Sequence, residues 1–255
     1  MIRLFISDID GCLARPYQPF ELDKFAEIRQ LVEQAGLPGT DDIVPSFSIC
    51  SGRPYAYVEA MSQVLGLTTP VLFESGAGMF DPVAAQRRWH PGVDKTTLEE
   101  ISHVKSFMKR LAKNTVMMVD LAKQTQASVV APGPEPIEAI FLEVQAFVSL
   151  YHPGLETFQT LHSVDVLAPH LTKQAGVQWI ASSFDLDISE VAFIGDSEGD
   201  LGALQVVGRS YAPSNANIIV REKVDVATVG PDVVGVLEAY QEAIQFNQQT
   251  KRPGI

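Results

Sequence analysis

The chain begins with a short apolar segment that runs directly into two aspartates and a glycine. Residues 2–6 are mostly apolar, and Asp8, Asp10 and Gly11 follow at once. A buried parallel strand of this kind presents reactive side chains at its carboxyl end. Because side chains alternate along an extended chain, both carboxylates point to one side, where they repel each other unless a cation or proton intervenes. This start predicts a hard divalent metal at one edge of a parallel sheet.

The segments that follow repeat a short apolar strand and an amphipathic helix. This alternation is typical of an α/β fold with a Rossmann-like parallel sheet. It stops near residue 81 and resumes near residue 168, so we expect a discontinuous core domain made of residues 1–81 and 168–245. The expected core strands are residues 46–50, 71–73 and 191–194, and the expected core helices are residues 22–35, 54–65, 172–182 and 233–244.

Residues 82–167 form an inserted segment with a different order of elements. Helix, strand and strand occur twice, as αββαββ, which suits an antiparallel sheet with helices on one face. We therefore predict a separate α+β cap domain over this range. Residues 246–255 are polar, and we expect a loose C-terminal tail.

Composition excludes several classes of protein. No apolar stretch approaches the roughly 20 residues of a membrane helix. Because Met1 runs straight into the expected first strand, we also expect no signal peptide. We expect a cytoplasmic protein, either a monomer or a homodimer, with Cys12 and Cys50 as reduced thiols. The net charge of −12 argues against a nucleic-acid partner.

A second motif, Ser51-Gly52-Arg53, lies between a predicted strand and a predicted helix. The Ser51 hydroxyl and the Gly52 amide are suited to a phosphate at a helix N-terminus. The alternative is that Ser51 caps the helix, which explains a serine at this position equally well.

Two further elements carry charge near predicted strand and helix ends. Asp196 and Asp200 follow another buried strand and lie about one helical turn apart, so that both can approach one metal. An acidic helix start is the alternative. Lys173 opens a helix, where its charge is electrostatically disfavoured, which suggests that the charge serves another purpose; a surface lysine is the ordinary alternative.

Taken in order, the four elements are DxDG at residues 8–11, Ser51-Gly52-Arg53, Lys173, and the segment from Gly195 to Asp200. This constellation resembles the haloacid dehalogenase superfamily of phosphohydrolases. An insertion between the second and third motifs resembles the branch with large αβ caps, which includes sugar phosphatases and phosphoglycolate, sucrose-phosphate and mannosyl-phosphoglycerate phosphatases. The chain departs from the usual pattern at Cys12, Ser75, Gln174 and Gly199, none of which removes a charged catalytic group.

The resemblance implies a phosphoric monoester hydrolase that acts on a small ester of the sugar-phosphate or phosphoglycolate type. Asp8 is expected to attack phosphorus and form an aspartyl-phosphate, and Asp10 to act as general acid and base. Ser51, Gly52 and Lys173 are expected to bind the phosphate.

The resemblance also implies Mg²⁺ as cofactor. Its expected ligands are Asp8, the backbone carbonyl of Asp10, and Asp196, with Asp200 acting through a water or by orienting Lys173.

Substrate choice is expected to depend on residues beside the motifs and on closure of the cap. The candidates for substrate specificity are Arg53, Glu74 and Ser75. Two alternatives remain at this point: a phosphomutase of the same superfamily, similar to phosphomannomutase, and a catalytically silent module that binds phosphate ligands and regulates a partner.

Overall fold

The core is built on a five-stranded parallel sheet. A computed structural model describes residues 1–160 and 162–251. Its central strand, β1 (Leu4–Ser7), lies between β10 (Val191–Ile194) and β2 (Ser46–Ile49), with Ser7 opposite both Ile194 and Ile49. Beyond β10, the strands β11 (Arg209–Ala212) and β12 (Val226–Ala227) complete the order β12-β11-β10-β1-β2. The predicted parallel α/β core is confirmed.

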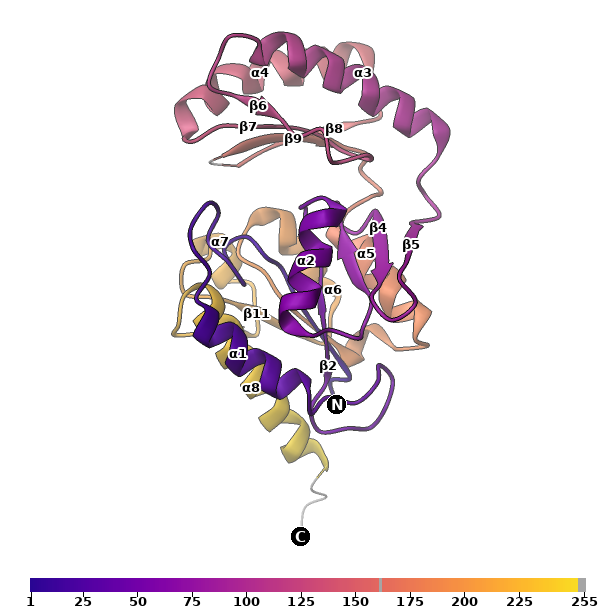
Figure 1. Cartoon of the computed structure of the whole chain (residues 1–255), viewed down its shortest axis with the longest axis vertical. Helices are drawn as coiled ribbons and strands as arrows, with labels where there is room; N and C mark the ends of the chain where they lie inside the picture. Colours follow the sequence, from indigo (N-terminus) through magenta and orange to yellow (C-terminus); the bar gives the residue numbers. More distant parts are fainter. Residues whose placement is uncertain (161, 252–255) are drawn as a thin grey trace.

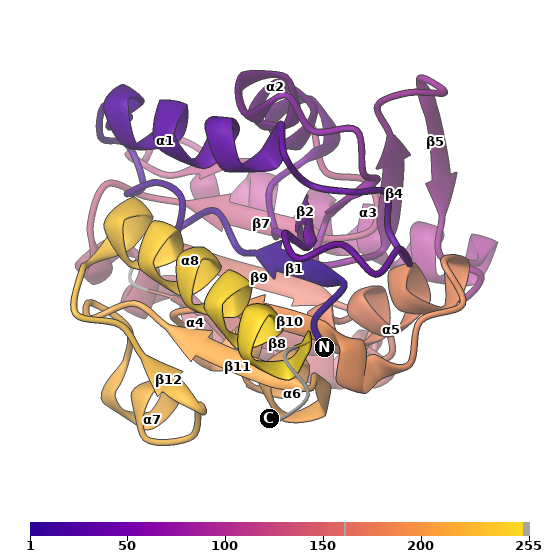
Figure 2. The same cartoon turned by 90° about the horizontal axis from the view of Figure 1, so that it is seen from below.

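Helices cover both faces of this sheet because its strands are apolar on both sides. Phe5 packs on the face covered by α1 (Leu22–Val32), α2 (Tyr55–Leu65) and α8 (Asp232–Lys251). Its neighbours Leu4 and Ile6 face α5 (Lys173–Ser183), α6 (Leu201–Val206) and α7 (Ile218–Arg221). Figure 2 shows α1 and α8 lying side by side along the core. Short 3₁₀ turns at Ile188–Glu190 and Glu198–Asp200 complete this part.

A small antiparallel sheet follows β2 along the chain, and it extends past the expected boundary between core and cap. It consists of β3 (Val71–Phe73), β4 (Gly78–Asp81) and β5 (Gln86–Trp89). We expected the cap to begin at Pro82, but β5 pairs with β4 and continues that hairpin. All four β5 residues are exposed, so the strand has no apolar alternation that sequence reasoning could detect.

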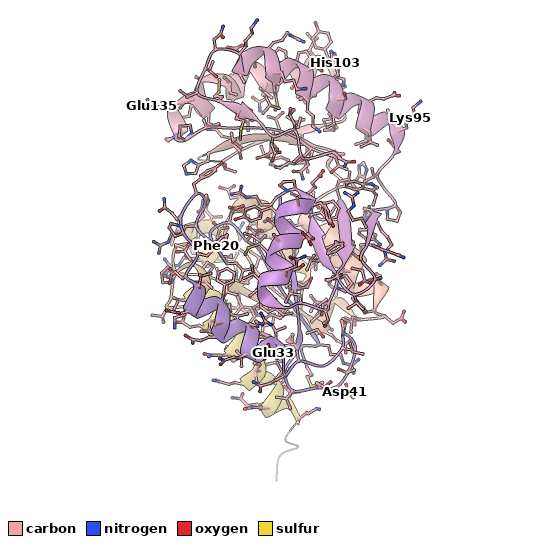
Figure 3. The ribbon with its side chains drawn as sticks, viewed as in Figure 1. Phe20, Glu33, Asp41, Lys95, His103 and Glu135 are labelled. Carbon is pink, nitrogen blue, oxygen red and sulfur yellow. The ribbon has the colours of Figure 1, made fainter. Side chains whose placement is uncertain are left out.

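The cap is a four-stranded antiparallel sheet with two long helices on one side. The strands β6 (Met118–Val119), β7 (Ala127–Val130), β8 (Glu156–Gln159) and β9 (Ser163–Leu167) pair in the order β6-β7-β9-β8. The helices α3 (Lys95–Ala112) and α4 (Pro134–Tyr151) lie on the side away from the core, so the open face of the sheet is turned toward the core (Figure 1). In Figure 3 the labelled side chains of Lys95, His103 and Glu135 lie on this outer, helical layer.

The C-terminal segment is not the loose tail that its polar composition predicted. Helix α8 continues to Lys251, and residues 252–255 lie outside the described residues. The reason is Asn247, which is fully buried and exchanges hydrogen bonds with the backbone of Ile2 and donates another to the carbonyl of Ile43. A buried amide with all these partners anchors the helix to the start of β1. None of the helices in the described residues combines the length and apolar character that crossing a bilayer requires.

Candidate active site

Three parallel strands bring the predicted site residues to one edge of the core sheet, on the side that faces the cap. Asp8 follows β1, Ser51 follows β2, and Asp196 follows β10. Lys173 is the first residue of α5, and Asp200 immediately precedes α6. Residues separated by almost the whole chain therefore meet because the carboxyl ends of parallel strands share an edge.

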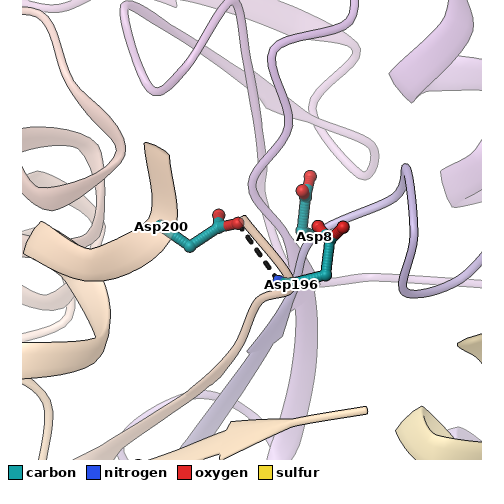
Figure 4. A group of neighbouring side chains, drawn as sticks. All are labelled: Asp8, Asp196 and Asp200. Carbon is teal, nitrogen blue, oxygen red and sulfur yellow. Dashed lines mark hydrogen bonds between the residues drawn. The ribbon is translucent and has the colours of Figure 1, made fainter. Parts of the chain in front are cut away.

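Three carboxylates form a compact cluster at this edge. One side-chain oxygen of each of Asp8, Asp196 and Asp200 lies within 4.8 Å of the others (Figure 4). Gly11 borders the cluster with a positive φ of 74°, and a Cβ there would lie 2.2 Å from a carboxylate oxygen of Asp196. Glycine is thus required after Asp10 both by the backbone turn and by the approach of this aspartate.

Lys173 contacts two members of the cluster and is only 8% exposed. Its ammonium donates to Asp8 Oδ2 at 2.7 Å and to Asp200 Oδ1 at 2.5 Å. Although burial opposes the charge, Asp200 and Asp8 raise the pKa of Lys173 well above its ordinary value. The lysine therefore stays positively charged beside Asp8, and its charge is paired with two buried carboxylates.

Asp200 is held rigidly by its own turn. Its Oδ2 accepts the backbone N–H groups of Asp196 and Ser197 at 3.2 and 3.0 Å, and the Ser197 hydroxyl at 2.8 Å. Since its other oxygen accepts from Lys173, both oxygens already have donors. This arrangement suits Asp200 to orienting the lysine.

The other two carboxylates of the cluster are buried and crowded by negative charge. Burial raises the pKa of Asp8 to about 7, with Asp200 and Asp10 adding to the shift and Lys173 opposing it. Burial, followed by the charges of Asp200 and Asp8, raises the pKa of Asp196 to about 8. In the described part of the chain no hydrogen-bond donor reaches the Asp196 carboxylate. Crowded, buried oxygens of this kind fit a divalent cation that prefers oxygen ligands.

Asp10 lies beside this cluster but has a different partner, which sequence reasoning missed. The guanidinium of Arg53 donates from Nε to Asp10 Oδ2 at 2.7 Å and from Nη2 to Oδ1 at 2.6 Å. The two side chains are 24% and 32% exposed, so the pair lies at the opening of the site. No spacing in the sequence links residues 10 and 53, because their contact depends on the pairing of β1 with β2.

Ser51 is fully buried at the end of β2. Its hydroxyl oxygen accepts the backbone N–H of Arg53 at 3.2 Å, which leaves its own proton free to donate. The helix-cap alternative is wrong, since α2 has Pro54 at its N-cap and no side-chain cap. At Gly52 a Cβ would have only an ordinary 3.5 Å contact with Ser75 Oγ, so packing does not require this glycine.

Glu74, a candidate for substrate specificity, forms hydrogen bonds to the cap. It is 1% exposed, and its carboxylate accepts the Gln124 N–H at 2.9 Å, the Thr125 N–H at 2.6 Å and the Thr125 hydroxyl at 2.7 Å. With three donors on its two oxygens, the carboxylate is fully engaged in joining core to cap. Nothing in the local sequence indicates this role, because the donors are mostly backbone groups about fifty residues away.

The turn that carries Glu74 also contacts the other site loops. The Ser75 N–H donates to the Ser51 carbonyl at 2.8 Å. Gly76 has a φ of 86°, and a Cβ on it would lie 2.6 Å from the Cα of Gly176 in α5. The turn therefore packs against both the Ser51 loop and the helix that begins at Lys173.

Both cysteines are buried and free, as expected for reduced thiols. Burial, reinforced by nearby carboxylates, raises the pKa of Cys12 and of Cys50 well above the ordinary value. Their thiolate forms are therefore disfavoured, and neither is suited to be a nucleophile.

Comparison with known proteins shows which hydrolases this chain resembles. A family model described as haloacid dehalogenase-like hydrolase matches residues 134–239. The chain is 25% identical to a phosphoglycolate phosphatase of Natronomonas pharaonis, over 95% of this chain and 98% of that protein.

Two solved structures share the fold. A crystal structure from Thermoplasma acidophilum matches with a TM-score of 0.74 at 20% identity, covering 95% of this chain and 98% of that one. The sucrose-phosphatase of Synechocystis, solved with sucrose and phosphate, matches with a TM-score of 0.65 at 15% identity and covers the same shares of the two chains.

Proposed function

We propose that this phosphatase, which belongs to the haloacid dehalogenase superfamily and to its branch with an αβ cap, hydrolyses a small phosphate monoester through an aspartyl-phosphate. The observation that carries the proposal is the placement of Asp8. It lies at the end of the central strand, 2.7 Å from the Lys173 ammonium and within the acidic cluster, with Asp10 two residues further on.

In the first step an oxygen of Asp8 forms a bond to phosphorus while the bond from phosphorus to the leaving oxygen breaks. Asp10 transfers a proton to that leaving oxygen. In the second step a water attacks the phosphorus of the aspartyl-phosphate, Asp10 takes the proton, and Asp8 is released with inorganic phosphate. Asp10 is suited to both transfers because it lies outside the cluster, at the opening of the site.

The transferring phosphoryl group carries negative charge on its oxygens. Lys173 supplies a positive charge beside Asp8, and the Ser51 hydroxyl and the Gly52 N–H are the further proposed donors. We assign Mg²⁺ to Asp8, Asp196 and the Asp10 carbonyl, where it would offset the charge of the carboxylates and of the phosphoryl group.

Among small esters, a phosphoglycolate-type substrate has the best support. The phosphoglycolate phosphatase of Natronomonas pharaonis aligns with nearly the whole of this chain, cap included. The sugar-phosphate alternative is supported only by a shared fold.

A panel of phosphate esters, assayed with Mg²⁺ and with EDTA, tests the proposal. We expect Mg²⁺-dependent release of inorganic phosphate, lost in Asp8→Asn while that variant keeps its circular dichroism spectrum. Asp23→Asn, at an exposed position on α1, is the matched control and should retain full activity. An isomerised ester with little free phosphate would instead indicate a mutase, and ligand binding without turnover would indicate a silent module.

A further inference from the structure

Arg53 uses only one edge of its guanidinium to hold Asp10. Of its five N–H groups, one on Nε and one on Nη2 donate to the two oxygens of that carboxylate. Within residues 1–160 and 162–251 no acceptor takes the remaining three, two on Nη1 and one on Nη2. The second edge of the guanidinium is therefore free, and the side chain is partly open to solvent.

Aromatic rings keep this guanidinium in place where the core meets the cap. Its Cζ lies 4.8 Å from the ring centroid of Tyr57 and 5.6 Å from that of Tyr17. The Tyr17 ring in turn contacts the ring of His162 in the cap, with centroids 6.0 Å apart. A guanidinium held by two rings and one carboxylate loses little further freedom when it binds a second anion.

The free edge borders the space that the leaving group must occupy. In the proposed reaction Asp10 protonates the leaving oxygen, so the atoms next to that oxygen lie beside Asp10 and hence beside Arg53. A carboxylate there would face repulsion from Asp8 and Asp196, and Lys173 is already paired with Asp8 and Asp200. A second cation is needed, and a guanidinium edge matches a carboxylate in two parallel hydrogen bonds.

We propose that the free edge of Arg53 binds a carboxylate carried by the leaving group, and so selects phosphate esters of short hydroxy acids. Arg53 then binds both the substrate carboxylate and Asp10, the residue that protonates the leaving oxygen. The inference rests on the proposed phosphatase reaction and specifies the substrate class of the same site.

The test compares two phosphate esters that differ only in the carboxylate of the leaving group. The first is 2-phosphoglycolate and the second is 2-hydroxyethyl phosphate, in which a hydroxymethyl group replaces the carboxylate. For the wild-type enzyme we expect kcat/KM to favour phosphoglycolate. In Arg53→Met this preference should fall about tenfold to a hundredfold, mainly through a higher KM for phosphoglycolate. Arg53→Lys keeps the positive charge but loses the paired N–H donors of the guanidinium, so its preference for phosphoglycolate should lie between those of the wild type and Arg53→Met.

The ratio between the two esters separates recognition from positioning. Loss of the Asp10 contact lowers turnover of both esters alike and cancels in the ratio. Arg87→Met is the matched control, because Arg87 also stacks on a tyrosine, with its Cζ 4.5 Å from the Tyr55 centroid, but forms no hydrogen bond or ion pair with a proposed site residue in the described part of the chain.

Each outcome decides the matter. An equal loss for both esters in Arg53→Met and Arg53→Lys would show that Arg53 only positions Asp10. A wild-type enzyme that hydrolyses both esters without preference would overturn the inference and leave the phosphatase proposal standing. Hydrolysis of neither ester, with activity on other esters of the panel, would overturn the inference alone, and no hydrolysis of any ester in the panel would overturn the phosphatase proposal as well.

Discussion

The carboxylate of Glu74, in the core, accepts the backbone N–H of Thr125, in the cap, at 2.6 Å. The Thr125 hydroxyl and the Gln124 N–H complete its hydrogen bonds, and the acid is almost fully buried. Hydrogen bonds to an ionised carboxylate are stronger than those between neutral groups. Since the adjacent Ser75 donates to the Ser51 carbonyl, the position of the cap is coupled to the loop proposed to bind phosphate.

Replacing this acid tests the coupling. In Glu74→Gln an amide nitrogen replaces one acceptor oxygen, so part of the contact is lost, at a cost of about 1.5–3 kcal/mol. We expect faster hydrogen exchange at residues 121–126 and a roughly tenfold fall in kcat/KM. Glu143→Gln, at an exposed position on α4, is the control and should change neither measurement. Unchanged exchange in Glu74→Gln would refute the coupling.

Sequence reasoning located the proposed site residues because their placement follows from strand order alone. Asp8, Ser51 and Asp196 each come directly after an apolar strand, and parallel strands end at one edge. Residues that act at a distance from strand ends were harder to interpret. The partner of Arg53 depends on the approach of a neighbouring loop, and the partners of Glu74 depend on the orientation of the cap. The sequence around these two residues indicates neither.

The two errors in the fold have a common physical origin. Strand β5 has the sequence Gln-Arg-Arg-Trp and is exposed throughout, so hydrogen bonding to β4, without burial, defines it. The last turns of α8 are polar, and Asn247 anchors them through buried hydrogen bonds in place of apolar contacts. Hydrophobic periodicity detects elements through burial of apolar side chains and misses those held by polar groups.

Removing one carboxylate of the cluster should weaken cation binding. Asp196→Asn replaces an oxygen pair that no donor among the described residues satisfies, so the main loss is of a metal ligand. Calorimetric titration with Mg²⁺ should show at least a roughly tenfold weaker affinity than in the wild type, since the loss of one charged ligand costs more than about 1.4 kcal/mol. Asp23→Asn is again the control. Equal affinity in the two variants would place the cation elsewhere.

Asp200 should act through Lys173. In Asp200→Asn the amide can still accept from the Ser197 turn, but the lysine loses one of its two acidic partners. We expect kcat to fall about tenfold to a hundredfold with a smaller change in KM. Mg²⁺ affinity, measured by calorimetry, should change less than in Asp196→Asn. A variant that binds Mg²⁺ more weakly than Asp196→Asn does, but keeps the wild-type kcat at saturating Mg²⁺, would instead make Asp200 a metal ligand.

Asp165 should make the stability of the cap depend on pH. Its carboxylate lies on the face of the cap sheet toward the core and accepts from the Lys123 ammonium at 3.0 Å and from the hydroxyls of Ser128 and Ser163. Burial opposes its ionisation, but Lys123 and the two hydroxyls outweigh burial and lower the pKa of Asp165 below its ordinary value.

The lowered pKa of Asp165 determines how stability changes with pH. Because the pKa is lower in the folded state, the contribution of Asp165 is fully present above the unfolded value of about 4, and it is lost as the pH falls through the folded value. Denaturant unfolding at pH 7, 5 and 3 should show the wild type more stable than Asp165→Asn at pH 7 and 5, with the difference shrinking toward pH 3. Asp23→Asn should stay close to the wild type throughout. A difference that grows on acidification would mean that burial dominates and that the Lys123 pair does not stabilise the ionised acid.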